Sequence, residues 1–218
     1  MKNRLLTTLF AIALIVFIIT FSIGLPIYCR FFYYLQIKPL GLEKITGYDY
    51  ATIKSAYDEV LNYLTLPGQE FGTGVFTYTE AGKAHFVDCK ALFNLNIIAL
   101  IISSITLITL LILNKKKVIT LVETGGFPAS FYSSVALLSL FLIIGILVAI
   151  DFDSAFKVFH QIFFPGKDNW IFSSKDQIIY ALPSQFFLNC GILIISSITI
   201  FTSTFITLGI IKKVKNKK

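Results

Sequence analysis

The chain contains only two histidines, His85 and His160, and imidazole is the side chain best suited to proton transfer near neutral pH. Each lies a few residues from a long apolar segment, so we expect the two rings at similar depth. Carboxylates in the same parts of the chain could orient an imidazole or raise its basicity: Glu80, Asp88, Asp151, Asp153 and Asp176. The histidine pair is therefore the leading candidate for a site that works by acid and base catalysis.

Other chemistries have less support from the sequence. Two histidines and a carboxylate could bind a metal ion, but there is no HExxH motif and no close pairing of ligands. There is no GxSxG motif, and Cys29 and Cys89 lie in no distinctive motif, which argues against a protein nucleophile. An interfacial histidine can also be an ordinary amphipathic residue, and composition alone does not separate that interpretation from catalysis. We predict no metal and no cofactor, and a substrate that brings its own nucleophile.

Four long apolar segments must position these residues. The composition is 56% hydrophobic and 14% charged, with a mean hydropathy of +0.78, which is too apolar for an ordinary soluble domain. Each segment has the roughly 20 residues that a helix needs to cross a bilayer. Because lipid offers the backbone no hydrogen-bond partners, apolar runs of this length without alternating polarity must be helices. We predict an all-α polytopic membrane protein, a four-transmembrane-helix bundle forming one domain over residues 1–218. The predicted spans are residues 5–27, 92–113, 131–150 and 186–211.

The basic residues predict the orientation. Ten Lys and Arg but a single acid, Glu123, lie at the chain ends and in the loop of residues 114–130; nine bases and eleven acids lie in the other two loops. Positive residues beside spans stay in the cytoplasm, so both chain ends should be cytoplasmic (N-in, C-in), with residues 28–91 and 151–185 extracytoplasmic. Topology and contact with anionic membrane lipid account for the net charge of +7, so we predict no nucleic-acid partner.

The first extracytoplasmic loop is long enough to hold structure of its own. Its residues 49–64 have helical periodicity, which predicts an amphipathic helix on the outer membrane surface, ended by Pro67-Gly68. The apolar positions of this helix are Ile53, Ala56, Tyr57, Val60, Leu61 and Leu64. Residues 75–78 read as a short extended segment after a turn. The second loop is aromatic-rich, which is typical of a segment that anchors a bundle at the lipid headgroups.

The N-terminal segment and the cysteines need separate interpretation. The first apolar run is longer than the core of a signal peptide, and residues 26–28 lack the small side chains that signal peptidases require. We expect it to stay attached. The spacing of Cys29 and Cys89 leaves a disulfide between them open, but the favoured interpretation is that these two residues and Cys190 are small apolar side chains near the membrane ends.

The sequences around the two histidines resemble one bacterial family. Residues 76–90 (FTYTEAGKAHFVDCK) and 159–172 (FHQIFFPGKDNWIF), with Asp176 and residues 183–187, resemble the lipoprotein intramolecular transacylases, four-span membrane proteins of Gram-positive bacteria. The likeness covers the whole predicted topology and is most specific in the two histidine segments. Cys89 stands where an aliphatic residue is expected, so one small apolar side chain replaces another.

The resemblance implies a membrane acyltransferase. Its substrates would be diacylglyceryl-modified bacterial lipoproteins, and it would move the sn-2 acyl chain onto the α-amine of the same cysteine, giving an N-acyl lyso-form lipoprotein. The amine is held close to its own ester, so no acyl-enzyme is required and proximity supplies much of the rate. The implied location is the bacterial cell membrane, with the site facing the extracytoplasmic side and open to membrane lipid.

The resemblance also implies roles for particular residues. His85 and His160 become the acid and base pair, with the two roles left unassigned. Glu80 and Asp88 become carboxylates that orient the imidazoles, although exposed acids are often merely solvated. If the second span is already helical at His85, then Asp88 and Cys89 share its face at the i+3 and i+4 positions.

Four further residues are implied around this pair. Tyr57 and Asn62 would donate hydrogen bonds near the site. The alternative is that Tyr57 simply packs in a core and that Asn62 is simply solvated. Trp170 would line a cleft open to lipid, although interfacial anchoring also explains a tryptophan there. Asp176 would pair with Lys90 or cap the fourth span.

Rival functions stay open at this level. A non-catalytic binding protein or transporter subunit could use the same topology, although the spans carry no charged residue and show no inverted repeat. A lipid or lipoprotein hydrolase could use the same histidines to activate water. Product analysis separates hydrolysis from acyl transfer.

Overall fold

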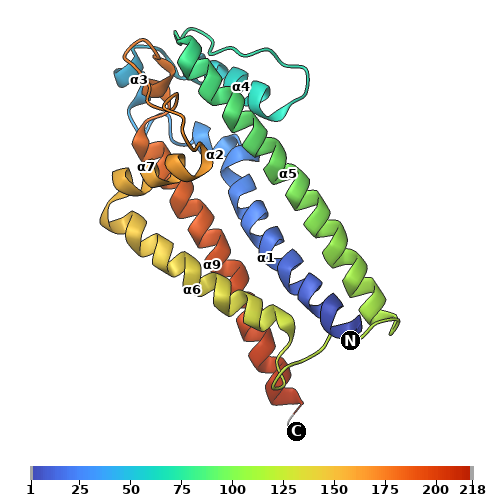
Figure 1. Cartoon of the computed structure of the whole chain (residues 1–218). Helices are drawn as coiled ribbons and strands as arrows, with labels where there is room; N and C mark the ends of the chain where they lie inside the picture. Colours follow the sequence, from blue (N-terminus) through green and yellow to red (C-terminus); the bar gives the residue numbers. More distant parts are fainter. Residues whose placement is uncertain (1, 217–218) are drawn as a thin grey trace. The chain divides into compact units, whose positions relative to one another are not determined.

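The computed structural model describes residues 2–216, and the order of their helices can be followed in Figure 1. Four helices are long and apolar enough to cross a membrane: α1 (Lys2–Tyr28), α5 (Glu80–Lys115), α6 (Ala129–Ile150) and α9 (Ser184–Lys215). The shorter helices are α2 (Phe31–Tyr34), α3 (Leu42–Thr46), α4 (Tyr50–Thr65), α7 (Phe152–Phe163) and α8 (Ile178–Ala181). These described residues include no β-strand, which confirms the predicted all-helical membrane fold.

The chain forms two compact units, each assembled from separated stretches of sequence. The span unit comprises residues 1–23, 96–146 and 194–218, and the loop unit comprises residues 24–95 and 147–193. The interpretation of residues 1–218 as one membrane domain stays a prediction.

The span unit packs around a small apolar core. Its buried residues are Phe10, Ala13, Leu14, Ile18, Leu107, Leu110, Leu137 and Ile198. Hydroxyl and amide groups add bonds between helices: the Ser22 hydroxyl donates to the Ser197 hydroxyl over 3.0 Å, and Asn96 donates to the backbone oxygen of Thr20 over 3.2 Å. Such bonds hold spanning helices together where burial of apolar surface gives little net attraction.

The outer surface of the span unit is apolar as well. On α5 and α6, large aliphatic side chains are exposed in runs, among them Ile98, Ile101, Ile105, Leu140 and Ile143. Water would not tolerate a continuous apolar surface of this kind on a monomer, whereas lipid does. The packing therefore agrees with the hydropathy of these helices, and the protein is a multi-pass membrane protein.

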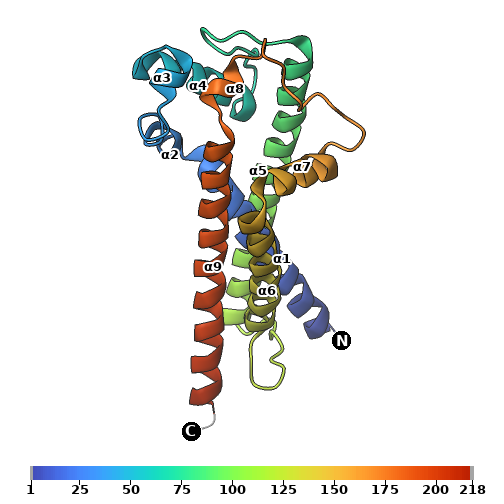
Figure 2. The same ribbon diagram turned by 90° about the vertical axis from the view of Figure 1, so that its left-hand side faces the viewer.

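Helix α4 follows the predicted helix to within one residue at each end. The Asp49 carboxylate caps it by accepting the Thr52 backbone N–H over 2.8 Å. All six apolar positions predicted for this helix are buried. They pack in the core of the loop unit with Tyr33, Ile37, Leu42, Phe86 and others, so the apolar face of α4 contacts protein. That α4 lies on the outer membrane surface stays a prediction. Figure 2 shows α4 and α8 beside α3 in this unit.

Two parts of the loop unit differ from the sequence prediction. Helix α5 begins at Glu80, twelve residues before the predicted start of the second span, and the preceding residues 75–78 form a turn and irregular chain rather than an extended strand. The second loop holds an unpredicted amphipathic helix, α7, capped by Asp151, which accepts from the Ser154 backbone over 3.0 Å. These two helices carry the two histidines.

Candidate active site

His85 lies in the second turn of α5, and the start of that helix is fixed by a residue from the second loop. One carboxylate oxygen of Asp176 accepts hydrogen bonds from the backbone N–H and the hydroxyl of Thr79, over 2.7 and 2.8 Å. The Thr79 hydroxyl oxygen in turn accepts the Gly82 N–H over 3.0 Å, as an N-cap does. The early start of α5 therefore depends on a side chain almost one hundred residues away in the sequence.

Asp176 itself is 1% exposed and fully bonded. Its second oxygen accepts from the backbone N–H and hydroxyl of Ser173, over 2.9 and 2.8 Å. Burial alone would raise the pKa of Asp176, but the hydrogen bonds from Thr79 and Ser173 outweigh it and hold that pKa below its ordinary value. Asp176 neither pairs with Lys90 nor caps the fourth span, because these donors occupy it; the Lys90 ammonium lies instead over the Tyr63 ring.

His160 lies near the end of α7 with one ring nitrogen bound to its own helix. Its Nδ1 is 2.7 Å from the backbone oxygen of Phe156, and since a carbonyl can only accept, Nδ1 carries the hydrogen. Burial lowers the pKa of His160 below its ordinary value, and the Phe156 carbonyl acts in the opposite direction by favouring the charged ring. In the neutral ring, Nε2 is then the nitrogen with a free lone pair.

The two imidazoles lie together although 75 positions separate them in the sequence. Their ring centroids are 5.6 Å apart, and the side chains of His85 and His160 are 5% and 6% exposed. The Phe164 ring lies against both imidazoles, with its centroid 4.9 Å from that of His85 and 5.7 Å from that of His160. Trp170 stacks on His160 at 4.8 Å, and Phe172 meets His85 edge-on at 5.5 Å. The pair is thus enclosed by aromatic rings that exclude water.

His85 makes one polar contact and leaves one nitrogen unused. Its Nε2 lies 3.4 Å from the Sγ of Cys89, one helical turn further along α5. Its Nδ1 is buried and has no hydrogen-bond partner among the residues the structure describes. Unpaired buried polar atoms are uncommon in folded proteins, and a catalytic role is one of the explanations for such an atom.

Asp88 shares the face of His85 as the sequence indicates, but its carboxylate is bonded elsewhere. It accepts from the Lys167 ammonium over 2.5 Å and from the Asn169 amide over 2.9 Å. No hydrogen bond joins Asp88 to either imidazole in the described part of the chain. Asp88 therefore holds the second loop against α5, and Trp170 is tied to the same loop because its indole N–H donates to the Lys167 backbone oxygen over 2.8 Å.

Three other predicted site residues make their contacts elsewhere in the described part of the chain. Glu80 is exposed at the first position of α5. Tyr57 is buried in the core of the loop unit, with its ring stacked on that of Tyr33 at 3.8 Å. Asn62 lies on α4 and accepts from the guanidinium of Arg30 over 2.7 Å. Among residues 2–216, no hydrogen bond or ring contact links these three side chains to the imidazoles.

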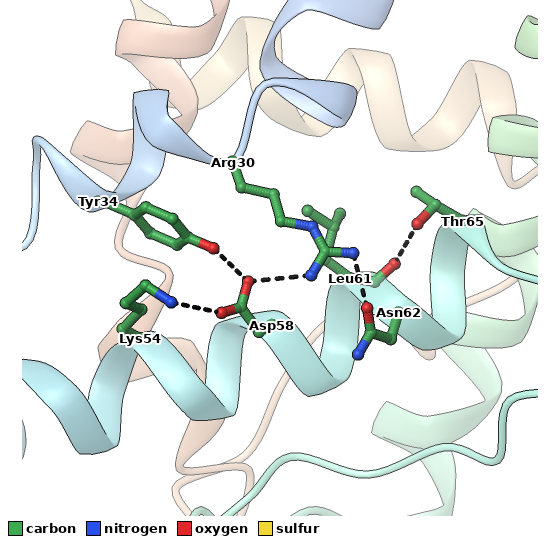
Figure 3. Close-up of polar contacts among 7 residues, drawn as sticks. All are labelled: Arg30, Tyr34, Lys54, Asp58, Leu61, Asn62 and Thr65. Atoms are coloured by element: carbon green, nitrogen blue, oxygen red, sulfur yellow. Dashed lines mark hydrogen bonds and ion pairs between the residues drawn. The ribbon is translucent and has the colours of Figure 1, made fainter.

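Figure 3 shows the network around Asn62, which is built on charge pairing. Arg30 also donates to Asp58 over 3.0 Å, and Lys54 pairs with the other oxygen of the same carboxylate over 2.9 Å. The Tyr34 hydroxyl completes the set by donating to Asp58. This network attaches α4 to the segment after α1, which is a structural role.

The sequence did not indicate all of the residues that contact the histidines. Phe156 and Phe172 were predicted only as part of an aromatic-rich anchoring loop, and Cys89 only as a small apolar replacement. Phe164, like Trp170, was predicted to line a cleft open to lipid or to anchor the bundle at the interface. The helical spacing of Phe152, Phe156 and His160 after an Asp cap was the signal that α7 existed. Among the described residues no three His, Cys, Asp or Glu side chains gather as metal ligands would, and all three cysteines are free thiols.

The fold and site define a helical membrane protein with a paired-histidine centre, and comparison with known proteins gives its family. The profile of the lipoprotein intramolecular transacylase Lit family matches residues 8–187, so the chain belongs to that family and is an acyltransferase. The solved structure of lipoprotein intramolecular transacylase Lit from Bacillus cereus matches with a TM-score of 0.85 at 23% identity, over 99% of this chain and 97% of that one.

Two variants of the same Bacillus cereus protein give similar results. The structures carrying that protein's H85R and H85A mutations each have a TM-score of 0.78 at 21% identity and cover 99% of this chain, and 94% and 96% of theirs respectively. At these identities the likeness to solved structures establishes the fold alone. No curated protein matches the chain.

Proposed function

We propose that this acyltransferase moves the sn-2 acyl chain of a diacylglyceryl-cysteine lipoprotein onto the α-amine of the same cysteine, with His85 and His160 as its acid and base pair. The observation that carries the proposal is the contact of two buried imidazoles from distant segments, one with an unpaired nitrogen, in a chain of this family. The bond changes lie within one substrate molecule, so the protein needs to supply positioning and proton transfer.

The reaction balances without a protein nucleophile. The amine nitrogen attacks the carbonyl carbon of the sn-2 ester, a C–N bond forms, and the C–O bond to the glyceryl oxygen breaks. One proton must leave the attacking nitrogen and one must reach the departing oxygen. The products are an amide and a free hydroxyl, with no acyl-enzyme on the path.

Two neutral imidazoles suit this proton balance. One ring takes the proton from the amine, and either that ring or its neighbour, after receiving the proton, gives it to the glyceryl oxygen. The 5.6 Å between ring centroids places the rings within reach of one small reacting group. The aromatic enclosure strengthens each interaction with developing charge, because it keeps water away.

The location of the site is part of the proposal. A helix of 36 residues is about 54 Å long, whereas the hydrocarbon core is about 30 Å thick, so part of α5 must extend beyond it. Lysines follow the other end of α5, at Lys115 to Lys117, and this charge favours a cytoplasmic position for that end. The histidine end of α5 would then lie at the extracytoplasmic surface, where lipoproteins present their acyl chains.

The supporting residues divide by their contacts. Trp170 lines the pair directly by stacking on His160, and Asp88 acts through Lys167 and Asn169 rather than on an imidazole. Asp176 positions the turn that carries His85. Any role of Glu80, Tyr57 or Asn62 in binding substrate stays a prediction and would need contacts formed only with substrate present.

Mass spectrometry of a lipoprotein N-terminal peptide tests this function. The purified protein is incubated with a diacylglyceryl-cysteine lipopeptide, and the total mass and the mass on the amine are measured. An unchanged total mass with one acyl chain moved to the amine is the expected result. Loss of an acyl mass with release of free fatty acid would mean hydrolysis. An unaltered peptide would favour a non-catalytic binding protein.

A further inference from the structure

The contact between His85 and Cys89 assigns a role to the cysteine. We propose that Cys89 is a positioning residue: it accepts the Nε2–H of His85, fixes one tautomer of the ring, and leaves Nδ1 unprotonated and able to take the proton of the substrate amine. The proposal rests on the function proposed above and identifies Nδ1 as the atom of His85 that accepts the proton.

The first step concerns geometry. His85 and Cys89 are four positions apart on α5, so their side chains lie on the same face of the helix. The Sγ atom is 3.4 Å from Nε2, which is within hydrogen-bond range for sulfur. Both side chains face the interior, where the imidazole is 95% covered and the thiol is partly buried.

The second step concerns the choice between two tautomers. If the thiol donated to Nε2, the ring hydrogen would sit on Nδ1. That N–H would then be buried without an acceptor among the described residues, since Nδ1 has no partner there. If Nε2 carries the hydrogen, it has sulfur as an acceptor and Nδ1 keeps a bare lone pair. Unpaired buried N–H groups are rarer in proteins than unpaired buried acceptors, so the second arrangement is favoured.

The third step compares the two histidines. In His160 the Phe156 carbonyl fixes the hydrogen on Nδ1 and leaves Nε2 bare. In His85 the sulfur fixes the hydrogen on Nε2 and leaves Nδ1 bare. The two rings therefore hold opposite tautomers, each set by a group of the same helix four residues away. The bare nitrogen that takes the proton of the amine becomes an N–H, and this N–H, or the second ring after the proton has passed to its bare nitrogen, then protonates the glyceryl oxygen.

Nuclear magnetic resonance tests the proposal directly, because the chain has only two histidines. The protein is labelled with ¹⁵N-histidine in detergent micelles at about pH 8, where both rings are neutral. The ring nitrogens report which of them is protonated, and a His160→Gln variant assigns the signals. We expect Nε2–H at His85 and Nδ1–H at His160. The Nδ1–H tautomer at His85 in the unaltered protein would overturn the proposal.

Substitutions of the cysteine extend the test. In Cys89→Ala the Nε2–H loses its acceptor, so the His85 signal should become a mixture of tautomers and kcat should fall about tenfold with KM unchanged. Cys89→Ser keeps an acceptor at the same place and should keep both the tautomer and a rate within about threefold of the original. Cys190→Ala, which removes a partly buried free thiol from a different helix, α9, is the matched control and should change neither the tautomer nor kcat.

The outcomes separate this proposal from the proposed function. If Cys89→Ala leaves both tautomer and kcat as in the unaltered protein, Cys89 has no positioning role even though acyl transfer stands. If the tautomers behave as expected but no preparation moves an acyl chain, the positioning stands and the proposed reaction fails. A fall in thermal stability with an unchanged tautomer would indicate packing alone and would also overturn the proposal.

Discussion

The span unit and the loop unit use their polar side chains in different ways. In the span unit, hydroxyls mostly bond to the backbone of their own helix, as Thr202 does with Ile198, or make a single bond between helices, as Ser22 does. In the loop unit, polar groups join segments far apart in the sequence, as Asp176 does with Thr79. Hydropathy predicts the helices of the span unit, whereas the arrangement of the loop unit depends on bonds between particular distant residues.

This difference locates the chemistry. A spanning helix must satisfy its backbone polar groups internally, because lipid offers no partners. The Ser134 hydroxyl of the span unit is also buried without a partner, but a hydroxyl does not exchange protons near neutral pH as an imidazole does. The loop unit instead leaves the Nδ1 of His85 unpaired inside an aromatic enclosure. Changes at the histidines should therefore affect the reaction, and changes at the network of Figure 3 should affect stability.

Removing an imidazole should give the largest effect. His85→Gln or His160→Gln should lower the rate of acyl transfer by at least about 10²-fold, because a proton acceptor or donor is lost. Initial rates with a lipopeptide substrate measure the change, and the yield of membrane-inserted protein should stay the same. Lys157→Gln, on the exposed side of the helix that carries His160, is the matched control. A double histidine variant with the original rate would refute the assigned chemistry.

Removing the carboxylate that anchors the start of α5 should lower stability. Asp176→Ala leaves four donors of Thr79 and Ser173 without their acceptor in a buried place, and should lower the free energy of unfolding by about 2–3 kcal/mol. Denaturant unfolding in micelles measures it. Asp49→Ala removes the exposed cap of α4 and should cost about 1 kcal/mol. An equal or smaller loss for Asp176→Ala would contradict the role of Asp176 as the anchor of the histidine helix.

The pH dependence should follow burial of the histidine on α7. Burial lowers the pKa of His160, so this ring stays neutral at pH values where an exposed histidine is already partly protonated. Burial also lowers the pKa of His85, to about 4, so the rate should stay level on moving down from neutral pH and fall only as the pH approaches these lowered pKa values and protonation removes the free lone pairs. A pH–rate profile from pH 4 to 8 measures it. A rate that is flat throughout, or one that rises in acid, would argue against a neutral imidazole pair.

The network on α4 should give the smallest catalytic effect. Asn62→Ala removes one partner of the partly exposed Arg30, which should cost about 1 kcal/mol of stability or less and leave the rate within about twofold. Thermal unfolding and initial rates are measured on the same preparation. A tenfold loss of rate at unchanged stability would show that Asn62 contacts substrate, and would move the boundary of the site to include α4.

The parts of the molecule that sequence predicted well are those with a repeated signal. Runs of about 20 apolar residues gave the four spans, and the helical period gave α4 with all six of its buried positions. The same period could not tell what the apolar face would meet, because lipid and a protein core both accept Ile53 and Leu64. In the structure the apolar face of α4 packs in the protein core of the loop unit.

The parts predicted less well depend on contacts between distant segments. The start of α5 at Glu80 has a weak local signal, because Thr79 is an N-cap residue followed by an acid, but the carboxylate of Asp176 that binds Thr79 comes from the second loop and cannot be read locally. Asp88 was expected to orient an imidazole because it lies three positions from His85, but Lys167 and Asn169 compete for it. Cys89 appeared neutral because only the size and apolar character of its side chain were considered. Its capacity to form a hydrogen bond with His85 became visible only in the structure.

A crossover experiment with labelled substrate is the most direct test of the central claim. Two lipopeptides are mixed, one carrying a deuterated sn-2 chain and the other an unlabelled peptide with ordinary chains, and tandem mass spectrometry reads the acyl group on each amine. Transfer within one molecule at the histidine pair predicts that each amine receives the sn-2 chain of its own glyceryl group and that His160→Gln abolishes the product. Deuterated chains on the unlabelled peptide, or sn-1 chains on either amine, would contradict the account.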